Sequence, residues 1–208
     1  ADEELIEYPD GAKFIVYKGN NGAWKDSEGD YGKEKCIGYV KTNINKNAEV
    51  HFRCEGANQN GEKFSNNNFR DKVTILNFIF TSCTGPCPLM TSNMQKLYSN
   101  FKGTKEVQFV SITVDPEVDT QEKLKLEAEM IGVDNNQWQF LRSDLDEVKK
   151  LKRDGFMLFA DNLPNGHSIK SILIDNVGNI RKYYDGTDIG SQEILKKDIV
   201  YLLDNMSL

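Results

Sequence analysis

The 208-residue chain has few of the residues that build metal sites and disulfide scaffolds, since it contains only four Cys and two His. Four cysteines are too few for a disulfide framework, and a chain of this length can bury a core without one. They suffice for one disulfide, one redox pair or one metal site. Their positions must therefore decide which of these they form.

Long apolar runs and an excess of positive charge are also missing. The longest apolar run, Val73–Phe80, contains polar residues and is far too short to span a bilayer. The 26 Lys and Arg face 32 Asp and Glu, a formal net charge of −6. This balance argues against nucleic acid as a partner, because no basic stretch offers a footprint for phosphates. The chain begins with Ala1 and shows no signal peptide, which is compatible with an upstream signal or anchor that has been removed.

Residues 1–48 differ from the rest of the chain, because glycines interrupt every apolar run there. Two short strands are predicted, at Lys13–Tyr17 and Ile37–Thr42. The stretch Asn20–Lys35 is rich in Gly, Asn and Asp and is predicted to be a loop. We interpret residues 1–48 as an N-terminal extension of strands and loops, and residues 49–208 as a separate domain.

The domain at 49–208 alternates between strand and helix patterns. The predicted strands are Val50–Cys54, Val73–Phe80, Glu106–Val114, Trp138–Leu141, Ser168–Asp175 and Asn179–Asp185. The predicted helices are Pro88–Phe101, Thr120–Ile131, a segment from Ser143 or Asp144 to Arg153, and Ser191–Met206. This order, which ends in a hairpin and a helix, predicts an α/β fold with thioredoxin-like topology, in which helices flank a central mixed sheet.

Two cysteines, Cys83 and Cys87, lie where the predicted strand Val73–Phe80 gives way to a helix. The unpaired N–H groups and the dipole at a helix N-terminus favour a thiolate over a thiol. Three residues separate the cysteines, against two in common dithiol oxidoreductases, and the wider loop leaves room for an ion between the sulfurs. The spacing favours a redox pair or a metal site, and it does not exclude a disulfide.

His167 is the candidate third ligand, because it directly precedes the predicted strand Ser168–Asp175. In a thioredoxin-like sheet the loop before this strand packs against the cysteine loop. Two thiolates and one imidazole make a soft trigonal site that suits copper, with zinc as the competitor. His51 has no such setting and is expected on the exposed face of a strand.

Three segments in order carry a family resemblance: TSCTGPCP, VSITVDPEVDTQEKL and GHSIKSILIDNVGNI. Across 49–208 the chain resembles the SCO/SenC family, copper-binding thioredoxin-fold proteins involved in cytochrome c oxidase assembly. The resemblance implies that Cys83, Cys87 and His167 bind one copper ion, as Cu(I) or Cu(II). It also implies an extracytoplasmic location, with an N-terminal membrane anchor that this chain does not contain.

The resemblance leaves two functions open. A copper metallochaperone would deliver copper to the copper A site of oxidase subunit II, or exchange it with another copper protein or a second chaperone. A thiol–disulfide oxidoreductase would instead reduce partner cysteines through Cys83 and Cys87, without metal. A peroxidase of the thioredoxin superfamily is less well supported, because no Arg lies near Cys83 in the sequence. Whether the chain is an enzyme therefore stays open.

The remaining cysteines and methionines have structural interpretations. Cys36 and Cys54 lie outside the motif and are a candidate disulfide in an oxidising compartment, with two unpaired thiols as the alternative. Met90 and Met94 continue the cysteine stripe at helical spacing and are expected in the core, although thioethers also suit Cu(I).

Two acidic positions near the expected site complete the prediction. Asp115 and Asp119 precede the helix that starts at Thr120, and we expect them to form a turn and cap that helix. The alternative is a supporting role behind the site or a contact with a partner. Gly166 stands where the family often has an acidic residue before the His, so a contact through that carboxylate is not expected here.

Overall fold

The computed structural model describes most of the chain from residue 55 onwards and short strands before it. The described residues are 2–7, 13–18, 24–26, 29–31, 55–161, 163–164 and 168–206. The strands are β1 (Asp2–Glu7), β2 (Lys13–Lys18), β3 (Trp24–Asp26), β4 (Gly29–Tyr31), β5 (Glu55–Ala57), β6 (Lys63–Ser65), β7 (Val73–Ile79), β8 (Val107–Thr113), β9 (Trp138–Leu141), β10 (Lys170–Ile174) and β11 (Ile180–Asp185). The helices are η1 (Asn66–Phe69), α1 (Cys87–Phe101), α2 (Gln121–Met130), α3 (Leu145–Lys150), η2 (Leu151–Gly155) and α4 (Ile189–Asp204).

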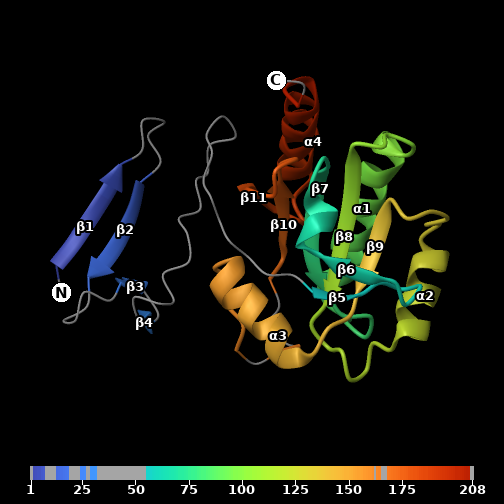
Figure 1. Cartoon of the computed structure of the whole chain (residues 1–208), viewed down its shortest axis with the longest axis horizontal. Coiled ribbons are helices and arrows are strands. Elements are labelled where there is room, and N and C mark those ends of the chain that lie inside the picture. The colour runs from blue at the N-terminus through green and yellow to red at the C-terminus, as the bar shows by residue number, and fades with distance from the viewer. Residues whose placement is uncertain are drawn as a thin grey trace.

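A five-stranded mixed sheet in the order β11-β10-β7-β8-β9 forms the centre of the domain (Figure 1). β7, β8 and β9 run parallel, and α1 connects β7 to β8. β10 is antiparallel to β7, with Ser171 opposite Asn77, and β11 is antiparallel to β10. This is the thioredoxin-like arrangement that the order of predicted elements indicates. β1 to β4 form a separate antiparallel sheet.

Each face of the central sheet is buried in its own core. Phe78 of β7 packs in a core with Val148 of α3, whereas Ile75 packs in a core with Leu97 of α1 and Leu195 of α4. Successive strand residues point to opposite faces, so a strand that is covered on both sides becomes a continuous apolar run. This explains why Val73–Phe80 is the longest apolar run of the sequence.

The β5–β6 hairpin covers the edge of the sheet at β9. Ala57 and Arg142 exchange two backbone hydrogen bonds of 2.9 Å each. The Gln59 side-chain amide donates to the Trp138 carbonyl at 3.1 Å and accepts from the Phe140 N–H at 2.9 Å. An amide side chain thus takes the place of a strand backbone and protects an edge that could otherwise pair with another chain.

Most predicted elements are confirmed to within two residues, and three predictions need correction. The loop predicted at Asn20–Lys35 contains the hairpin β3–β4, in which Trp24 lies opposite Tyr31; both residue types favour strands. The last helix begins at Ile189 and not at Ser191, because the Asp188 carboxylate accepts from the Ser191 N–H at 2.6 Å and forms the cap.

The third correction concerns the helix predicted to run to Arg153. Its α-helical part ends at Lys150, and the chain continues as the π-helical turn η2. The predicted strands Val50–Cys54 and Ile37–Thr42 lie outside the described residues. No helix in the described part of the chain has both the length and the apolar character required to cross a bilayer.

Lys152, in η2, is completely buried. Its Nζ lies 5.4 Å from the centre of the Phe78 ring and has no hydrogen-bond partner in the described part of the chain. Burial lowers the pKa of this lysine to about 8. The face of the Phe78 ring attracts the ammonium, but this attraction offsets only part of the hydration free energy that the ammonium loses on burial. The turn therefore carries an ammonium whose burial destabilises the fold.

We predict that Lys152→Met raises the free energy of unfolding by about 1–3 kcal/mol at pH 7. Methionine has a similar length to lysine, and the substitution removes a buried charge that no partner compensates. Below the folded-state pKa of about 8, Lys152 is charged in both states and the penalty is complete. Between that pH and the unfolded pKa of about 10.5 the folded protein sheds the proton and the penalty disappears. Denaturant unfolding should therefore show a smaller difference in stability between the variant and the parent protein at pH 10 than at pH 7. A variant that is less stable than the parent protein at pH 7 contradicts the interpretation.

Candidate metal centre

The two motif cysteines lie at the carboxyl end of the central strand β7. The chain leaves β7 at Ile79, turns so that the Cys83 N–H donates to the Phe80 carbonyl at 3.2 Å, and enters α1 at Cys87. Pro88 occupies the first turn of the helix, where a missing N–H costs nothing. Cys83 is half-buried, whereas Cys87 is only 5% exposed. The sequence correctly predicts this strand-to-helix junction.

The two thiols interact directly and share their protons unequally. Burial opposes ionisation of Cys83, but hydrogen bonds from the Cys87 side chain and from the backbone of Cys87 and Gly85 outweigh it and lower the pKa of Cys83. Burial, the hydrogen bond with Cys83 and the nearby charges of Cys83 and Asp119 raise the pKa of Cys87 to about 12. The pair therefore favours one thiolate, on the more exposed sulfur, and one thiol that donates to it.

A buried carboxylate anchors the start of the cysteine loop. Asp119 is 0% exposed and accepts from the Thr81 hydroxyl at 2.5 Å, from the Thr81 N–H at 3.1 Å and from the Thr113 hydroxyl at 2.5 Å. Thr81 follows β7 and Thr113 ends β8, so the carboxylate joins the ends of two neighbouring parallel strands. This interaction holds the segment that leads to Cys83.

The prediction that Asp119 caps α2 is therefore wrong, whereas the alternative of a supporting role beside the site fits its contacts with Thr81 and Thr113. The prediction for Asp115 is correct in part. The cap of α2 is the Thr120 hydroxyl, which accepts from the Lys123 N–H at 3.3 Å. The Asp115 carbonyl accepts from the Val118 and Asp119 N–H groups at 3.1 and 2.8 Å and forms the expected turn. Sequence reasoning missed Thr81 and Thr113; the available signal was a Thr at the end of each of two strands predicted to be neighbours.

The third predicted ligand, His167, lies outside the described residues, as do His51, Cys36, Cys54 and Gly166. Within the described part, no three side chains of His, Cys, Asp or Glu come together as a metal site. The two thiols alone have suitable chemistry for copper, because thiolates are soft ligands and one of the two ionises readily.

The residues that flank the β10–β11 hairpin, Ile169 and Gly186, run close to α1. The Gly186 N–H donates to the Ile169 carbonyl at 2.7 Å, and the Asn93 amide of α1 donates to the Gly186 carbonyl at 2.9 Å. A Cβ at Gly186 would lie 2.8 Å from that Ile169 oxygen and 3.1 Å from Met90 Cε, so this approach requires glycine. Met90 and Met94 are 2% and 1% exposed, which confirms their prediction as core residues.

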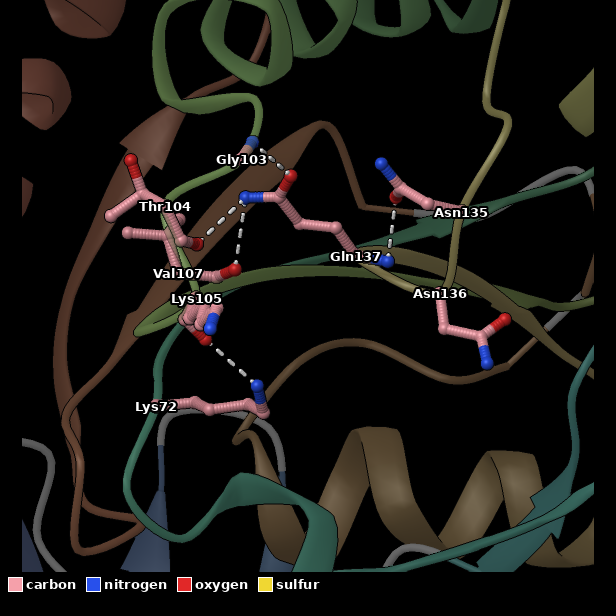
Figure 2. Close-up of a pocket in the computed structure, with 8 residues that line it drawn as sticks. All are labelled: Lys72, Gly103, Thr104, Lys105, Val107, Asn135, Asn136 and Gln137. Atoms are coloured by element: carbon pink, nitrogen blue, oxygen red, sulfur yellow. Dashed lines mark hydrogen bonds between the residues drawn. The ribbon is translucent and has the colours of Figure 1, made fainter.

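A pocket of about 390 Å³ lies at the opposite end of the sheet. Figure 2 shows the Gln137 amide inside it, donating to the Thr104 and Val107 carbonyls and accepting from the Gly103 N–H. The Lys72 ammonium donates to the Lys105 carbonyl at 2.9 Å. These contacts join the end of α1 to the start of β9, and we interpret the pocket as structural.

We predict that an alkylating reagent at pH 7.5 modifies Cys83 long before Cys87, because Cys83 is the more exposed and more acidic thiol. Peptide mass mapping at increasing times measures this order. Cys87→Ala removes the thiol donor and should raise the pKa of Cys83, whereas Cys87→Ser keeps a donor and serves as the matched control. Equal modification of both cysteines from the first time point would contradict the assignment.

We predict that Asp119→Asn lowers the free energy of unfolding by about 1–3 kcal/mol, because one amide oxygen cannot replace a carboxylate that accepts from Thr81 and Thr113. Asp115→Asn is the control. Burial and the charge of Asp119 raise the pKa of Asp115, so its neutral replacement should cost nothing. Denaturant unfolding compares the two variants, and equal stabilities would rule out the anchoring role.

Comparisons with known proteins agree with this fold and with the position of the cysteine pair. A SCO1/SenC family lipoprotein from Bacillus anthracis strain Ames is 34% identical, with a TM-score of 0.67 over 73% of this chain and 93% of that one. BsSco, a member of the Sco family of cytochrome c oxidase assembly proteins in which a disulfide switch was identified, is 25% identical, with a TM-score of 0.63 over 72% and 91%.

Copper-bound ScoI of Bradyrhizobium japonicum is 20% identical, with a TM-score of 0.62 over 74% of this chain and 99% of that one, a likeness that shows the shared fold. The family model described as SCO1/SenC matches residues 42–204. This match covers most of the chain and includes the strand-to-helix junction with Cys83 and Cys87. The chain therefore belongs to the SCO1/SenC family.

Proposed function

We propose that this protein binds one copper ion through Cys83, Cys87 and His167 and acts in the assembly of the copper A site of cytochrome c oxidase. The observation that carries the proposal is the contact between two thiols at the end of β7, one of which ionises readily. A pair of sulfurs at contact distance needs little rearrangement to hold one soft cation between them.

The sheet register supports His167 as the third ligand. β10 pairs with β7 antiparallel, with Ser171 opposite Asn77. Because the pairing is antiparallel, the start of β10, which follows His167 in the sequence, lies at the same end of the sheet as the end of β7, which leads to the cysteine loop. The bond between Ile169 and Gly186, next to Met90 of α1, supports the same approach.

The relatives support copper and the cellular setting. Copper was found in ScoI of Bradyrhizobium japonicum, and BsSco belongs to a family of oxidase assembly proteins. The relative from Bacillus anthracis is a lipoprotein, which supports an extracytoplasmic location with membrane attachment. Oxidase subunit II, another copper protein or a second copper chaperone would be the partner.

The same contact between thiols favours a second function, thiol–disulfide exchange. The Cys83 thiolate would attack a partner disulfide, form a mixed disulfide and release one partner thiolate. The Cys87 sulfur, after losing its proton, would then attack Cys83 Sγ and release the second partner thiolate. The partner gains two electrons, and its two thiolates take up the proton from Cys87 and one proton from solvent, to which Cys83 had lost its own. This chain keeps a Cys83–Cys87 disulfide that cannot hold copper.

Copper binding by the fully reduced protein tests the proposal. We predict that anaerobic titration with Cu(I) against a chromogenic chelator gives one copper per chain. Three variants should each weaken copper binding by more than about tenfold: Cys83→Ser, Cys87→Ser and His167→Ala. Loss of a residue that only orients a metal ligand already weakens binding by about tenfold or more, so loss of the ligand itself should cost more.

His51→Ala and the double variant Cys36→Ser/Cys54→Ser are the matched controls and should bind copper as the parent protein does. Binding that is unchanged in the two motif cysteine variants would refute the proposal. No binding by the parent protein, together with rapid reduction of a model disulfide, would favour the exchange function instead.

A further inference from the structure

Three large apolar side chains are exposed at the edge of the sheet that carries the cysteines. Leu89 of α1 is 49% exposed, Val118 in the β8–α2 turn is 39% exposed, and Ile189 at the start of α4 is 68% exposed. We call these three residues the apolar rim. Exposed apolar groups that gather at one place on a soluble domain indicate a contact surface.

The topology places the apolar rim at one edge. β7 and β8 are parallel, β10 is antiparallel to β7, and β11 is antiparallel to β10, so β7, β8 and β11 all end at the same side of the sheet (Figure 1). The cysteine loop and α1 follow β7. Val118 follows β8 and Ile189 follows β11, on opposite sides of the cysteine loop in the strand order.

Hydrogen bonds tie one flank to the start of the cysteine loop and the other flank to α1. On one side, Asp119, next to Val118, accepts from Thr81 at the start of the loop. On the other side, Gly186, three residues before Ile189, accepts from Asn93 of α1. The residues next to both flanks of the rim are therefore tied to the segments that lead into and out of the cysteine loop.

Each flank also carries an exposed carboxylate beside its apolar residue, Glu117 before Val118 and Asp188 before Ile189. Three cations nearby already face other groups. Burial and the charge of Asp119 raise the pKa of Asp115, and the charge of Lys123 only partly opposes them. Hydrogen bonds with Thr187 lower the pKa of Asp185, to which the charge of Lys170 contributes. The Arg142 Nε donates to the Pro116 carbonyl at 2.8 Å. The carboxylates at 117 and 188 therefore leave an excess of negative charge at the rim.

A bound copper ion and its ligands would add to this negative charge. In the proposed function, one Cu(I) with two thiolates and a neutral imidazole carries a net charge of −1. We propose that the apolar rim, with Glu117 and Asp188, is the docking surface for a copper-exchange partner whose own soft-ligand site lies in an apolar patch bordered by Lys or Arg. This inference rests on the proposed function and adds the chemistry of the partner's surface. Opposite charges at such a border steer the two sites together.

Two synthetic peptides test the docking surface directly. They share an apolar core with one Cys-X3-Cys segment; Lys residues flank the core in one peptide, and Glu residues flank it in the other. Fluorescence anisotropy measures their binding to the reduced full chain at 20 and 200 mM salt. The Lys peptide should bind at least about fivefold more tightly at low salt, and high salt should reduce the difference.

Two double variants separate charge from apolar contact. Glu117→Gln/Asp188→Asn removes both charges, keeps a cap on α4 and should abolish the preference for the Lys peptide. Leu89→Ser/Ile189→Ser should weaken binding of the Lys peptide. Glu129→Gln/Met130→Ser makes the same types of change at the far end of α2, where Met130 is 75% exposed, and should leave binding unchanged.

Equal binding of the two peptides at low salt, or rim variants that bind like the control variant, overturns the docking inference. Copper titration of the same variants keeps the two proposals apart. Rim variants that hold one copper as the parent protein does, yet bind both peptides alike, refute the docking surface and leave the proposed function intact. Loss of copper binding in the parent protein refutes the proposed function by an independent readout.

Discussion

The buried carboxylate of Asp119 is the interaction on which the cysteine site depends. A carboxylate without water is costly unless donors surround it, and here the Thr81 N–H, the Thr81 hydroxyl and the Thr113 hydroxyl supply them. These donors come from the ends of β7 and β8, so one group fixes the point from which the cysteine loop departs. Its charge also reaches Cys87 and helps to keep that sulfur protonated. The same residue thus fixes the start of the cysteine loop and adds, after burial and the contact with Cys83, to the raised pKa of Cys87.

The unequal pair of thiols has consequences for what the site can hold. Cys83 ionises more readily than an ordinary thiol, whereas Cys87 must lose its proton against burial and against the charges of Cys83 and Asp119. A metal that binds thiolates weakly does not offset that cost, but a soft cation such as Cu(I) does, and binding then releases a proton. The arrangement that resists a second free thiolate therefore selects for soft metals and against hard ones.

The elements of the sheet and the cysteine junction were predictable from the sequence, because buried strands and helix stripes leave a local periodic pattern. The role of Asp119 was not. An acidic residue just before a helix is most often a cap, and only the fold brings it to Thr81, 38 positions earlier. Gly186 is a similar case, since its need for glycine arises from Ile169 and Met90 and from nothing in its own segment. Asp188 and Ser191 are both residue types that cap helices, and the sequence does not decide between them. In the structure Asp188 caps α4.

Stability is distributed unevenly around this site. The cysteine side is held by α1, whose buried face packs against the sheet, and by Asp119. The segment that leads towards His167 begins with η2 and the buried ammonium of Lys152, and continues through Met157, whose backbone has a positive φ of 50°. Both features cost free energy, because the ammonium has lost its hydration and a residue with a Cβ is disfavoured at positive φ. Within the described residues, both features therefore reduce the stability of η2 and of the turn at Met157, whereas Asp119 supports the cysteine side.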